Sequence, residues 1–286
     1  MASFTNFATL SYNGVTRTSN TVTGELLEPV SVTQTAVVDA YAAGTDVTLA
    51  VSLINSGETD ANDLTVEDDL GGYLFDGATV YPLAYREGSV RYYVNGALQS
   101  PPAVSGGSVT FSGVDVPAGG NALLVYEATV TPYAPLAAGS TITDTVSVTG
   151  ASLSAPVTAT ETLTAAEEAQ LRIVKAVSPA VVSANGQLTY TFTVENTGNT
   201  AALAADGVVL ADTFDPILSA LAVSFNGAPW ASGTNYTYDA ASGAFASVAG
   251  QITVPAATYA QNADGTWAVT PGSAALTVSG TVVGTV

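Results

Sequence analysis

The sequence repeats itself at a constant offset of 141 residues, and this repeat sets the scale of anything the chain can fold into. The segment VSVTQTAVVDAYAAGTDVTLAVSLINSG, from Val30, aligns with LRIVKAVSPAVVSANGQLTYTFTVENTG, from Leu171. Further on, LTVEDDLG matches VVLADTFD, and VRYYVNGALQS matches LAVSFNGAPWAS. Two copies in 286 residues predict two domains of similar architecture.

Within each copy, short runs rich in Val, Thr and Ala alternate with period two and are interrupted by Asn-Gly, Ser-Gly, Gly-Gly and Pro. This pattern is typical of antiparallel strands joined by tight turns. We therefore expect an all-β chain of two tandem immunoglobulin-like β-sandwiches with almost no helix. The expected parts are an N-terminal hairpin and linker (1–29), domain one (30–165) and domain two (166–286), and these names are kept below.

The first copy ends in a hairpin that the second copy lacks. Domain one closes with ITDTVSVTGASLSAPVTATETLT, whereas domain two stops at Val286, in a segment that matches the strand before that hairpin. The N-terminus, FTNFATLSYNGVTRTSNTVTGEL, has the missing pattern of two alternating strands around a turn. We expect domain two to be open and to be completed in trans by the N-terminal hairpin of another copy.

In that arrangement Phe4, Ala8 and Leu10 fill the core of the neighbour's domain two, and the hairpin adds beside the strand Leu276–Val282 or elsewhere on the open sheet. The alternative is closure onto the chain's own domain two. About five linker residues reach at most roughly 18 Å, and a sandwich is roughly 30 Å long, so this alternative requires the two domains to fold side by side.

Composition narrows the function classes. The chain has no Cys and no His, which removes disulfides, thiolate metal sites and the commonest general base. Its formal charge of −19 disfavours binding to nucleic acid and to anionic membranes. The acidic stretch from Glu58 to Asp69 lacks a defined calcium-loop spacing. We assign no metal, no cofactor and no enzymatic substrate, and we expect other copies of the chain as partners.

The segment MASFTNF has neither a basic region nor an apolar core of a secretory signal, and no run has the length of a membrane helix. We expect an extracellular location, on a cell or spore surface, without membrane insertion. Three export routes stay open: a signal already removed, unconventional export, or release from a lysing mother cell.

Three strands each interrupt an apolar face once with a polar residue. Lys175, the only lysine, shares its face with Leu171, Ile173 and Val177. Asp212 interrupts the alternating set of VVLADTF, and Asn6 interrupts that of FTNFATL. Burying any of these groups unpaired costs several kcal/mol, so we expect the three to meet inside domain two.

Burial disfavours the charged forms of both Lys175 and Asp212. A neutral Lys175 amine would attack the side-chain carbonyl carbon of Asn6, while protonated Asp212 polarises that carbonyl and relays a proton to departing ammonia. The product is an amide bond between two subunits, formed in a single turnover. Two alternatives remain: a buried Lys175–Asp212 ion pair that does not react, and a lysine that extends to solvent.

Domain one has Gln34, Asp68 and Asp144 at the positions of Lys175, Asp212 and Asn6. The nucleophile is absent there, so we expect an uncrosslinked hydrogen-bond network. Two inward carboxylates without a cation should not both be ionised, so one of them should be protonated, with the Gln34 amide between them.

The pieces LRIVKAVSP, GQLTYTFTVENTGNTAA, VVLADTFDP and FTNFATLSY resemble the conserved-repeat domain of unknown function, number eleven in its series, of bacterial and archaeal surface proteins. That family is similar in architecture to the isopeptide-forming domains of Gram-positive pili and collagen adhesins, in which a first-strand Lys joins a last-strand Asn beside an acid. The resemblance implies a surface role. The leading hypothesis is a structural subunit of a head-to-tail filament, and its alternative is a monomeric adhesive or ligand-binding surface module.

Overall fold

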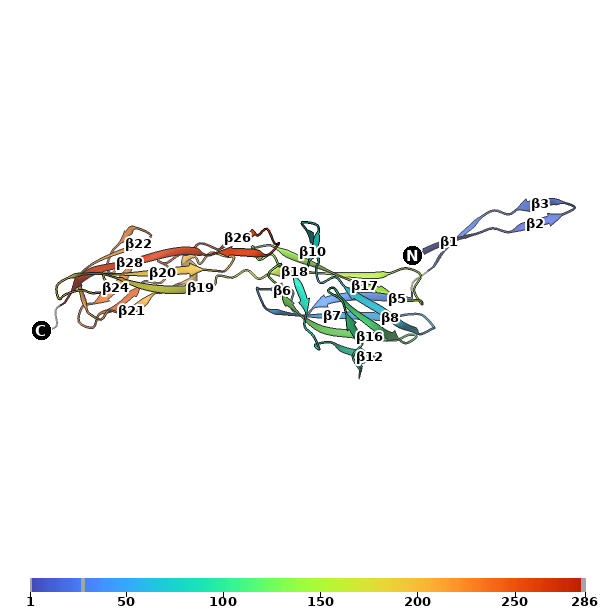
Figure 1. Ribbon diagram of the computed structural model, residues 1–286, viewed down its shortest axis with the longest axis horizontal. Helices are drawn as coiled ribbons and strands as arrows, with labels where there is room; N and C mark the ends of the chain where they lie inside the picture. The colour runs from blue at the N-terminus through green and yellow to red at the C-terminus, as the bar shows by residue number, and fades with distance from the viewer. Residues whose placement is uncertain (1, 27–28, 284–286) are drawn as a thin grey trace. The chain divides into compact units, whose positions relative to one another are not determined.

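The computed structural model describes residues 2–26 and 29–283 (Figure 1). The fold is all-β, as expected, and the helical content of these residues is one 3₁₀ turn, Ala204–Asp206. No helix among them is long and apolar enough to span a bilayer. Linker residues 27 and 28 and domain-two residues 284–286 lie outside the described ranges.

The chain divides into two compact units. The first comprises Met1–Pro135, Ser140–Ala165 and Asp264–Thr266, and the second comprises Leu136–Gly139, Ala166–Ala263 and Trp267–Val286.

Domain one consists of two six-stranded sheets and a small hairpin. The first sheet contains β13 (Ala97–Gln99), β12 (Arg91–Val94), β16 (Asn121–Val130), β7 (Asp46–Asn55) and β5 (Val30–Ala36), with β11 (Leu83–Tyr85) also paired to β16. The second contains β14 (Ala103–Ser105), β15 (Val109–Val116), β8 (Ala61–Asp68), β17 (Thr141–Thr149), β18 (Val157–Ala165) and β6 (Ala40–Tyr41). The small hairpin pairs β9 (Tyr73–Phe75) with β10 (Ala78–Val80).

Alternation of side chains explains how these strands pack. Along β7, and again along β16, every second residue is buried. The buried set includes Leu49, Leu53, Leu124 and Tyr126, which pack between the two sheets. The period-two pattern of the sequence therefore becomes one buried and one solvated face of each strand.

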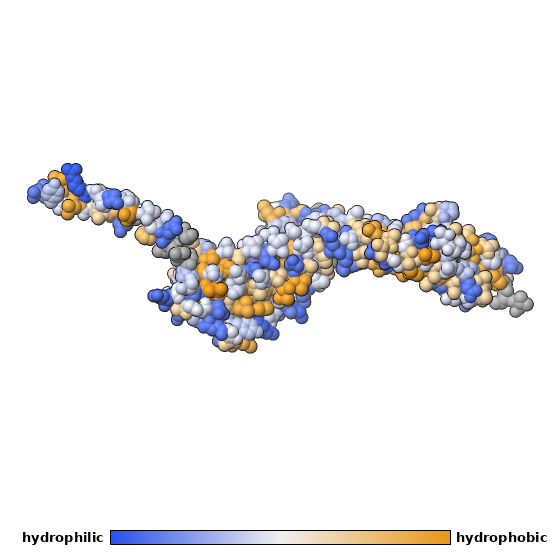
Figure 2. Space-filling view, turned by 180° about the vertical axis from the view of Figure 1, so that it is seen from behind, coloured by the Kyte–Doolittle hydropathy of each residue, from blue (hydrophilic) through white to orange (hydrophobic). Residues whose placement is uncertain are grey.

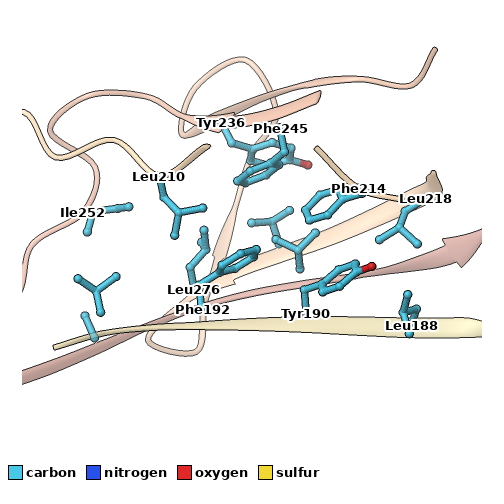
Figure 3. Packing of buried hydrophobic residues seen from close by; sticks show 14 of the residues in the cluster. Leu188, Tyr190, Phe192, Leu210, Phe214, Leu218, Tyr236, Phe245, Ile252 and Leu276 are labelled. Atoms are coloured by element: carbon cyan, nitrogen blue, oxygen red, sulfur yellow. The ribbon is translucent and has the colours of Figure 1, made fainter. Parts of the chain in front are cut away.

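Domain two has a comparable first sheet and a much smaller second one. The first sheet contains β19 (Leu171–Ser178), β20 (Gln187–Asn196), β28 (Gly272–Val282), β22 (Leu218–Phe225) and β23 (Ala228–Trp230). The second contains β21 (Ala211–Thr213), β25 (Ala244–Ser247) and β24 (Tyr236–Asp239). A further hairpin pairs β26 (Thr258–Gln261) with β27 (Trp267–Thr270). Figure 3 shows the apolar core of this domain.

The repeated Asn-Xaa-Gly motif has the same structural role in both domains. Asn55 and Asn196 are buried at the ends of β7 and β20. Each amide Nδ2 donates to the carbonyl four residues later, at 2.8 Å for Thr59 and 2.7 Å for Thr200, and to a second carbonyl distant in sequence. Each Oδ1 accepts from the glycine N–H two residues on. The motif thus provides hydrogen-bond partners for the backbone N–H and carbonyl groups of the turn that follows the strand.

The described part of domain two has no counterpart of β17 and β18. In domain one, β17 pairs with β8, and β18 packs against β5. In domain two, β21 takes the position of β8 but pairs only with β25, so its other edge is free within the described sheet. This corrects one expectation: β28 is already flanked by β20 and β22, so the hairpin has no edge available beside Leu276–Val282.

The absence of that cover exposes β19. In domain one, Val30 and Val32 of β5 are 2% and 8% exposed, whereas the equivalent Leu171 and Ile173 of β19 are 39% and 55% exposed. The face of β19 that carries Leu171 and Ile173 therefore meets solvent in the single chain.

The N-terminal segment forms a hairpin of four short strands. β1 (Ala2–Asn6) pairs with β4 (Val22–Leu26), and β2 (Thr9–Tyr12) pairs with β3 (Val15–Thr18). The sheets in which these strands take part contain no other strand. Phe4 and Leu10, expected in a core, are 52% and 66% exposed in the single chain, and Ala8 is exposed as well. Figure 2 shows apolar side chains on the surface of this hairpin.

Candidate functional site

Two of the three residues expected to meet in domain two are in contact. Lys175 on β19 and Asp212 on β21 form an ion pair, in which Nζ donates to Oδ2 of the carboxylate. The two strands belong to opposite sheets, so the pair bridges the sandwich near its open side. The side chains of Lys175 and Asp212 are 42% and 18% exposed. No described strand covers β19 in the single chain, so the burial of Lys175 that we expect in a completed domain two stays a prediction.

Three aromatic rings surround the Lys175 ammonium. Nζ lies 4.5 Å from the ring centroid of Tyr190, 5.5 Å from that of Phe192 and 5.9 Å from that of Phe214. The Tyr190 and Phe214 rings are stacked, with centroids 5.0 Å apart, and Figure 3 shows them facing each other. We call these three residues the aromatic cage.

The aromatic cage was not predicted from the sequence, although the pattern of two of its residues indicates it. Tyr190 and Phe192 alternate in LTYTFTV, and the β19–β20 register places Phe192 directly opposite Lys175. Residues opposite each other in an antiparallel ladder share a face of the sheet. The faces of aromatic rings attract cations, so the cage helps to hold the Lys175 side chain at the ion pair with Asp212.

The third expected residue, Asn6, lies on β1 of the N-terminal hairpin, where it is exposed. Among the described residues it makes no hydrogen bond with Lys175 or Asp212. The single chain thus brings together the amine and the acid but not the amide.

Domain one places its three equivalent residues in one buried cluster. The Gln34 Nε2 donates to Oδ2 of Asp144 at 2.6 Å and lies 3.4 Å from Oδ2 of Asp68. Gln34 is 4% exposed, and both aspartates are fully buried. A fourth member, Tyr126, donates its hydroxyl to Oδ2 of Asp68. It lies on β16 and was not predicted from the sequence.

The backbone around this cluster also donates to the carboxyl oxygens. The Leu70 N–H donates to Oδ1 of Asp68 at 2.7 Å, and the Gly71 N–H donates to Oδ1 of Asp144 at 3.0 Å. Asp69 lies close enough to form a triad of acidic oxygens with this pair. Every oxygen of Asp68 and Asp144 already accepts a hydrogen bond, so the cluster gives no reason to assign a cation.

Burial has a strong effect on the protonation of the aspartate pair. Desolvation and the neighbouring charge of Asp68 raise the pKa of Asp144 to about 10. Desolvation also raises the pKa of Asp68, although hydrogen bonds from Asp144, Tyr126 and Leu70 act in the opposite direction. The proton therefore belongs on Asp144, which shares it with the carboxylate of Asp68, whose charge is stabilised by hydrogen bonds from Tyr126 and Leu70.

We expect this buried acid to make domain one more stable in mild acid than in base. The folded state keeps the Asp144 proton up to about pH 10, whereas the unfolded chain releases it near the usual aspartate pKa of 3.8. The contribution is thus fully present below the unfolded pKa and declines as pH rises, by at most about 1.4 kcal/mol per pH unit. Urea unfolding of domain one between pH 5 and 9 measures it.

An Asp144→Asn variant should flatten this pH dependence, because its amide is neutral at every pH. Glu67→Gln is the matched control, since Glu67 lies beside Asp68 on β8 but is exposed. A stability of the unmodified domain that falls between about pH 6 and pH 4 would contradict a buried, protonated Asp144.

No family model matches the chain, and no curated protein matches it. The resemblance to the conserved-repeat surface domain and its two copies therefore stays a prediction.

Among solved structures, the chain is similar to the major pilin subunit BcpA of Bacillus cereus, with 12% identity, a TM-score of 0.35 and coverage of 94% of this chain and 73% of that one. It is also similar to a 35 kDa C-terminal fragment of the major pilin GBS80 of Streptococcus agalactiae (11% identity, TM-score 0.33, 85% of each chain). A third similar structure is the pilus backbone protein RrgB of Streptococcus pneumoniae (11% identity, TM-score 0.31, coverage of 90% of this chain and 50% of that one). TM-scores this low support no argument about function. The proposal below rests on the geometry of this chain.

Proposed function

We propose that the protein is a structural subunit of a head-to-tail surface filament, in which the N-terminal hairpin of one copy completes domain two of the next. The observation that carries this proposal is the contrast between β5 and β19. Domain one covers β5 with its own β18, whereas the equivalent face of β19 is exposed. A homologous hairpin with exposed apolar residues is present in the same chain and pairs only with itself.

Domain one supplies the register for this contact. There, Val146 and Val148 of β17 face the core and lie opposite Asp68 and Val66 of β8. With Asn6 in the place of Asp144, Ala8 and Leu10 take the places of Val146 and Val148. Ala8 would then lie opposite Asp212 at the free edge of β21, and backbone hydrogen bonds would continue the sheet.

The two strands at the base of the hairpin, β1 and β4, pack closely against each other. The ring of Phe4 lies against Gly24 on the paired strand, and a Cβ at Gly24 would come within 2.4 Å of that ring. The corresponding pair in domain one is Ile142 with Leu163.

The same register supports an amide bond between Lys175 of one subunit and Asn6 of the next. In domain one the Gln34 amide nitrogen touches the Asp144 carboxyl at 2.6 Å. With lysine in place of Gln34 and asparagine in place of Asp144, the amine nitrogen would lie beside the amide carbon of Asn6. Asp212, already in contact with Lys175, would serve as the acid. The bond would form only between chains, where it secures the filament.

Complementary variants test the head-to-tail contact. Phe4→Asp with Leu10→Asp disables the hairpin, and Ile173→Asp with Val177→Asp disables the open face of domain two. All four residues are exposed in the single chain, so the variants should fold. Each variant alone should be monomeric by light scattering, because one interface of a heterologous pair is lost.

An equimolar mixture should form dimers and nothing larger, since each dimer joins one intact hairpin to one intact acceptor. Long fibres from either variant alone, or a mixture that stays monomeric, would contradict the proposal. Unmodified protein that shows only single particles by negative-stain microscopy would favour the monomeric surface module instead.

A further inference from the structure

The small sheet of domain two has a hollow on its outer face. Along β25, Phe245 and Ser247 are buried, whereas Ala244 and Ala246 lie on the opposite, outward face of the strand. The hollow has a volume of about 630 Å³, and its lining residues all belong to β21, β24 and β25. None of the described residues of the opposing sheet lines it, so the hollow opens on the outer side of the sandwich.

Small side chains create this hollow. In the register of the sheet, Ala211 lies opposite Ala246, and Thr213 lies opposite Ala244. On the far side of β25, Thr237 and Asp239 lie opposite the same two alanines. The three alanine methyl groups offer apolar surface and leave room above the backbone for a larger side chain from a neighbouring strand.

Domain one is polar at the equivalent positions. Glu67 stands in the place of Ala211, and Ser108 and Thr110 stand in the places of Ala244 and Ala246. The Ser108 hydroxyl donates to Oε1 of Glu67 at 3.1 Å. The outer face of domain one thus carries hydrogen-bonded polar groups, whereas that of domain two carries exposed or half-buried alanines.

The N-terminal hairpin differs from β17 in the complementary way. The outward side of its first half is made of hydroxyl residues, Thr5, Thr9 and Ser11, and of one aromatic residue, Phe7. Phe7 is 60% exposed in the single chain. Its counterpart in domain one is Thr145, whose Oγ1 lies 3.4 Å from Oγ1 of Thr160. A large apolar side chain therefore replaces a polar one on the hairpin, where alanines replace polar residues on the sheet.

Domain one also fixes where Phe7 would lie. Thr145 is opposite Asp69, since the Asp69 N–H donates to the Thr145 carbonyl at 3.1 Å and the Thr145 N–H donates to Oδ1 of Asp69 at 3.0 Å. Asp69 corresponds to Thr213 of β21. With Ala8 opposite Asp212, Phe7 is opposite Thr213 and points to the same outer face as the hollow.

We propose that Phe7 of the incoming hairpin docks in the alanine-lined hollow of the next copy, so that the hairpin holds the small sheet of domain two from both faces. This inference rests on the proposed hairpin insertion. From a position opposite Thr213, an aromatic side chain reaches its diagonal neighbour Ala211 and the adjoining Ala246. Contact between the ring and the alanines removes apolar surface from water on both partners.

The outer contact and the core contacts require the same register. Core filling by Phe4, Ala8 and Leu10 places Phe7 outside, over the hollow. A slip of one residue would turn Phe7 into the core and the core residues into solvent. The hollow is thus a determinant of the register of the head-to-tail contact.

A reversible pair of full-length chains tests this contact. The donor chain carries Ile173→Asp and Val177→Asp, with Asn6→Ala to prevent cross-linking, and the acceptor chain carries Phe4→Asp and Leu10→Asp. Phe7→Thr in the donor introduces the residue that domain one has, and it should raise the Kd of the dimer about tenfold, as expected for a large apolar side chain that loses its contact. Leu74→Thr in the donor is the control, because Leu74 is 74% exposed on β9 of domain one; it should leave the Kd unchanged.

A second substitution, in the acceptor, tests whether Phe7 and the hollow touch. Ala211→Glu introduces the residue of domain one at an exposed position, so the sheet should still fold. It should weaken binding of the donor that has Phe7 and add little to the effect of Phe7→Thr, because residues in contact are energetically coupled. Effects that multiply as independent factors would overturn the contact.

An engineered disulfide tests the position of Phe7 directly, since the chain has no cysteine of its own. Phe7→Cys in the donor should form a disulfide with Thr213→Cys in the acceptor, because opposite residues of a ladder have Cβ atoms roughly 4.5–5.5 Å apart. It should not form one with Thr237→Cys, which is three strand spacings, about 14 Å, away.

The outcomes distinguish the hollow from the filament. Dimers that form with an unchanged Kd after Phe7→Thr, or without a disulfide at Thr213→Cys, overturn the docking of Phe7 and leave the head-to-tail contact standing. The absence of any dimer from the starting donor and acceptor overturns hairpin insertion and the docking of Phe7 together.

Discussion

Deletion of residues 1–23 should abolish fibre formation and leave monomers. The deletion removes Phe4 and Leu10, and burial of each such side chain in a neighbour's core contributes roughly 1.5–3 kcal/mol. It also removes the backbone partners that would extend the sheet at β21. Negative-stain microscopy and light scattering measure the loss, and domain two of the truncated chain should unfold at lower urea concentration than domain two in fibres.

A control for this deletion is the removal of an apolar side chain elsewhere on the surface. Leu98 on β13 is 62% exposed, so Leu98→Asp removes a comparable patch without touching the hairpin or domain two. That variant should form normal fibres. Fibres of normal appearance from the truncated chain would show that assembly does not use the hairpin.

Replacement of Lys175, Asn6 or Asp212 should abolish covalent oligomers while leaving non-covalent fibres. Wild-type fibres boiled in detergent should give a ladder of multiples of the subunit, and the linked peptide containing Lys175 and Asn6 should be about 17 Da lighter than its two parts. Lys175→Ala removes the nucleophile, Asn6→Ala the electrophile and Asp212→Ala the proton relay. Each should leave a single monomer band.

The three polar residues of domain one give the matched control for this experiment. Asp144→Asn changes the residue equivalent to Asn6 where Gln34, not lysine, lies beside it. It should leave the ladder unchanged. A monomer band alone from intact wild-type fibres would reject the covalent bond, although the head-to-tail contact would survive that result.

Much of this architecture is local in origin, which is why the sequence alone determined it. Side chains alternate along a strand whatever the strand pairs with, so period-two runs and Asn-Gly turns predicted an all-β chain. The same alternation placed Lys175 and Asp212 each on the apolar side of its strand, and the structure shows the two in contact. The same alternation predicted a hydrogen-bond network of Gln34, Asp68 and Asp144, and these residues lie together in domain one.

The tertiary structure alone decided which edges and faces are free. Strand pairing is non-local, so the sequence did not show that β28 has neighbours on both sides or that β21 has a free edge within the described sheet. Nor did it show that Lys175 is partly exposed in the single chain, because exposure depends on strands that lie across the sandwich. The Tyr126 hydroxyl reaches Asp68 from a strand that lies 58 residues away in the sequence. Such contacts are set by how the two sheets pack, and no local pattern encodes that packing.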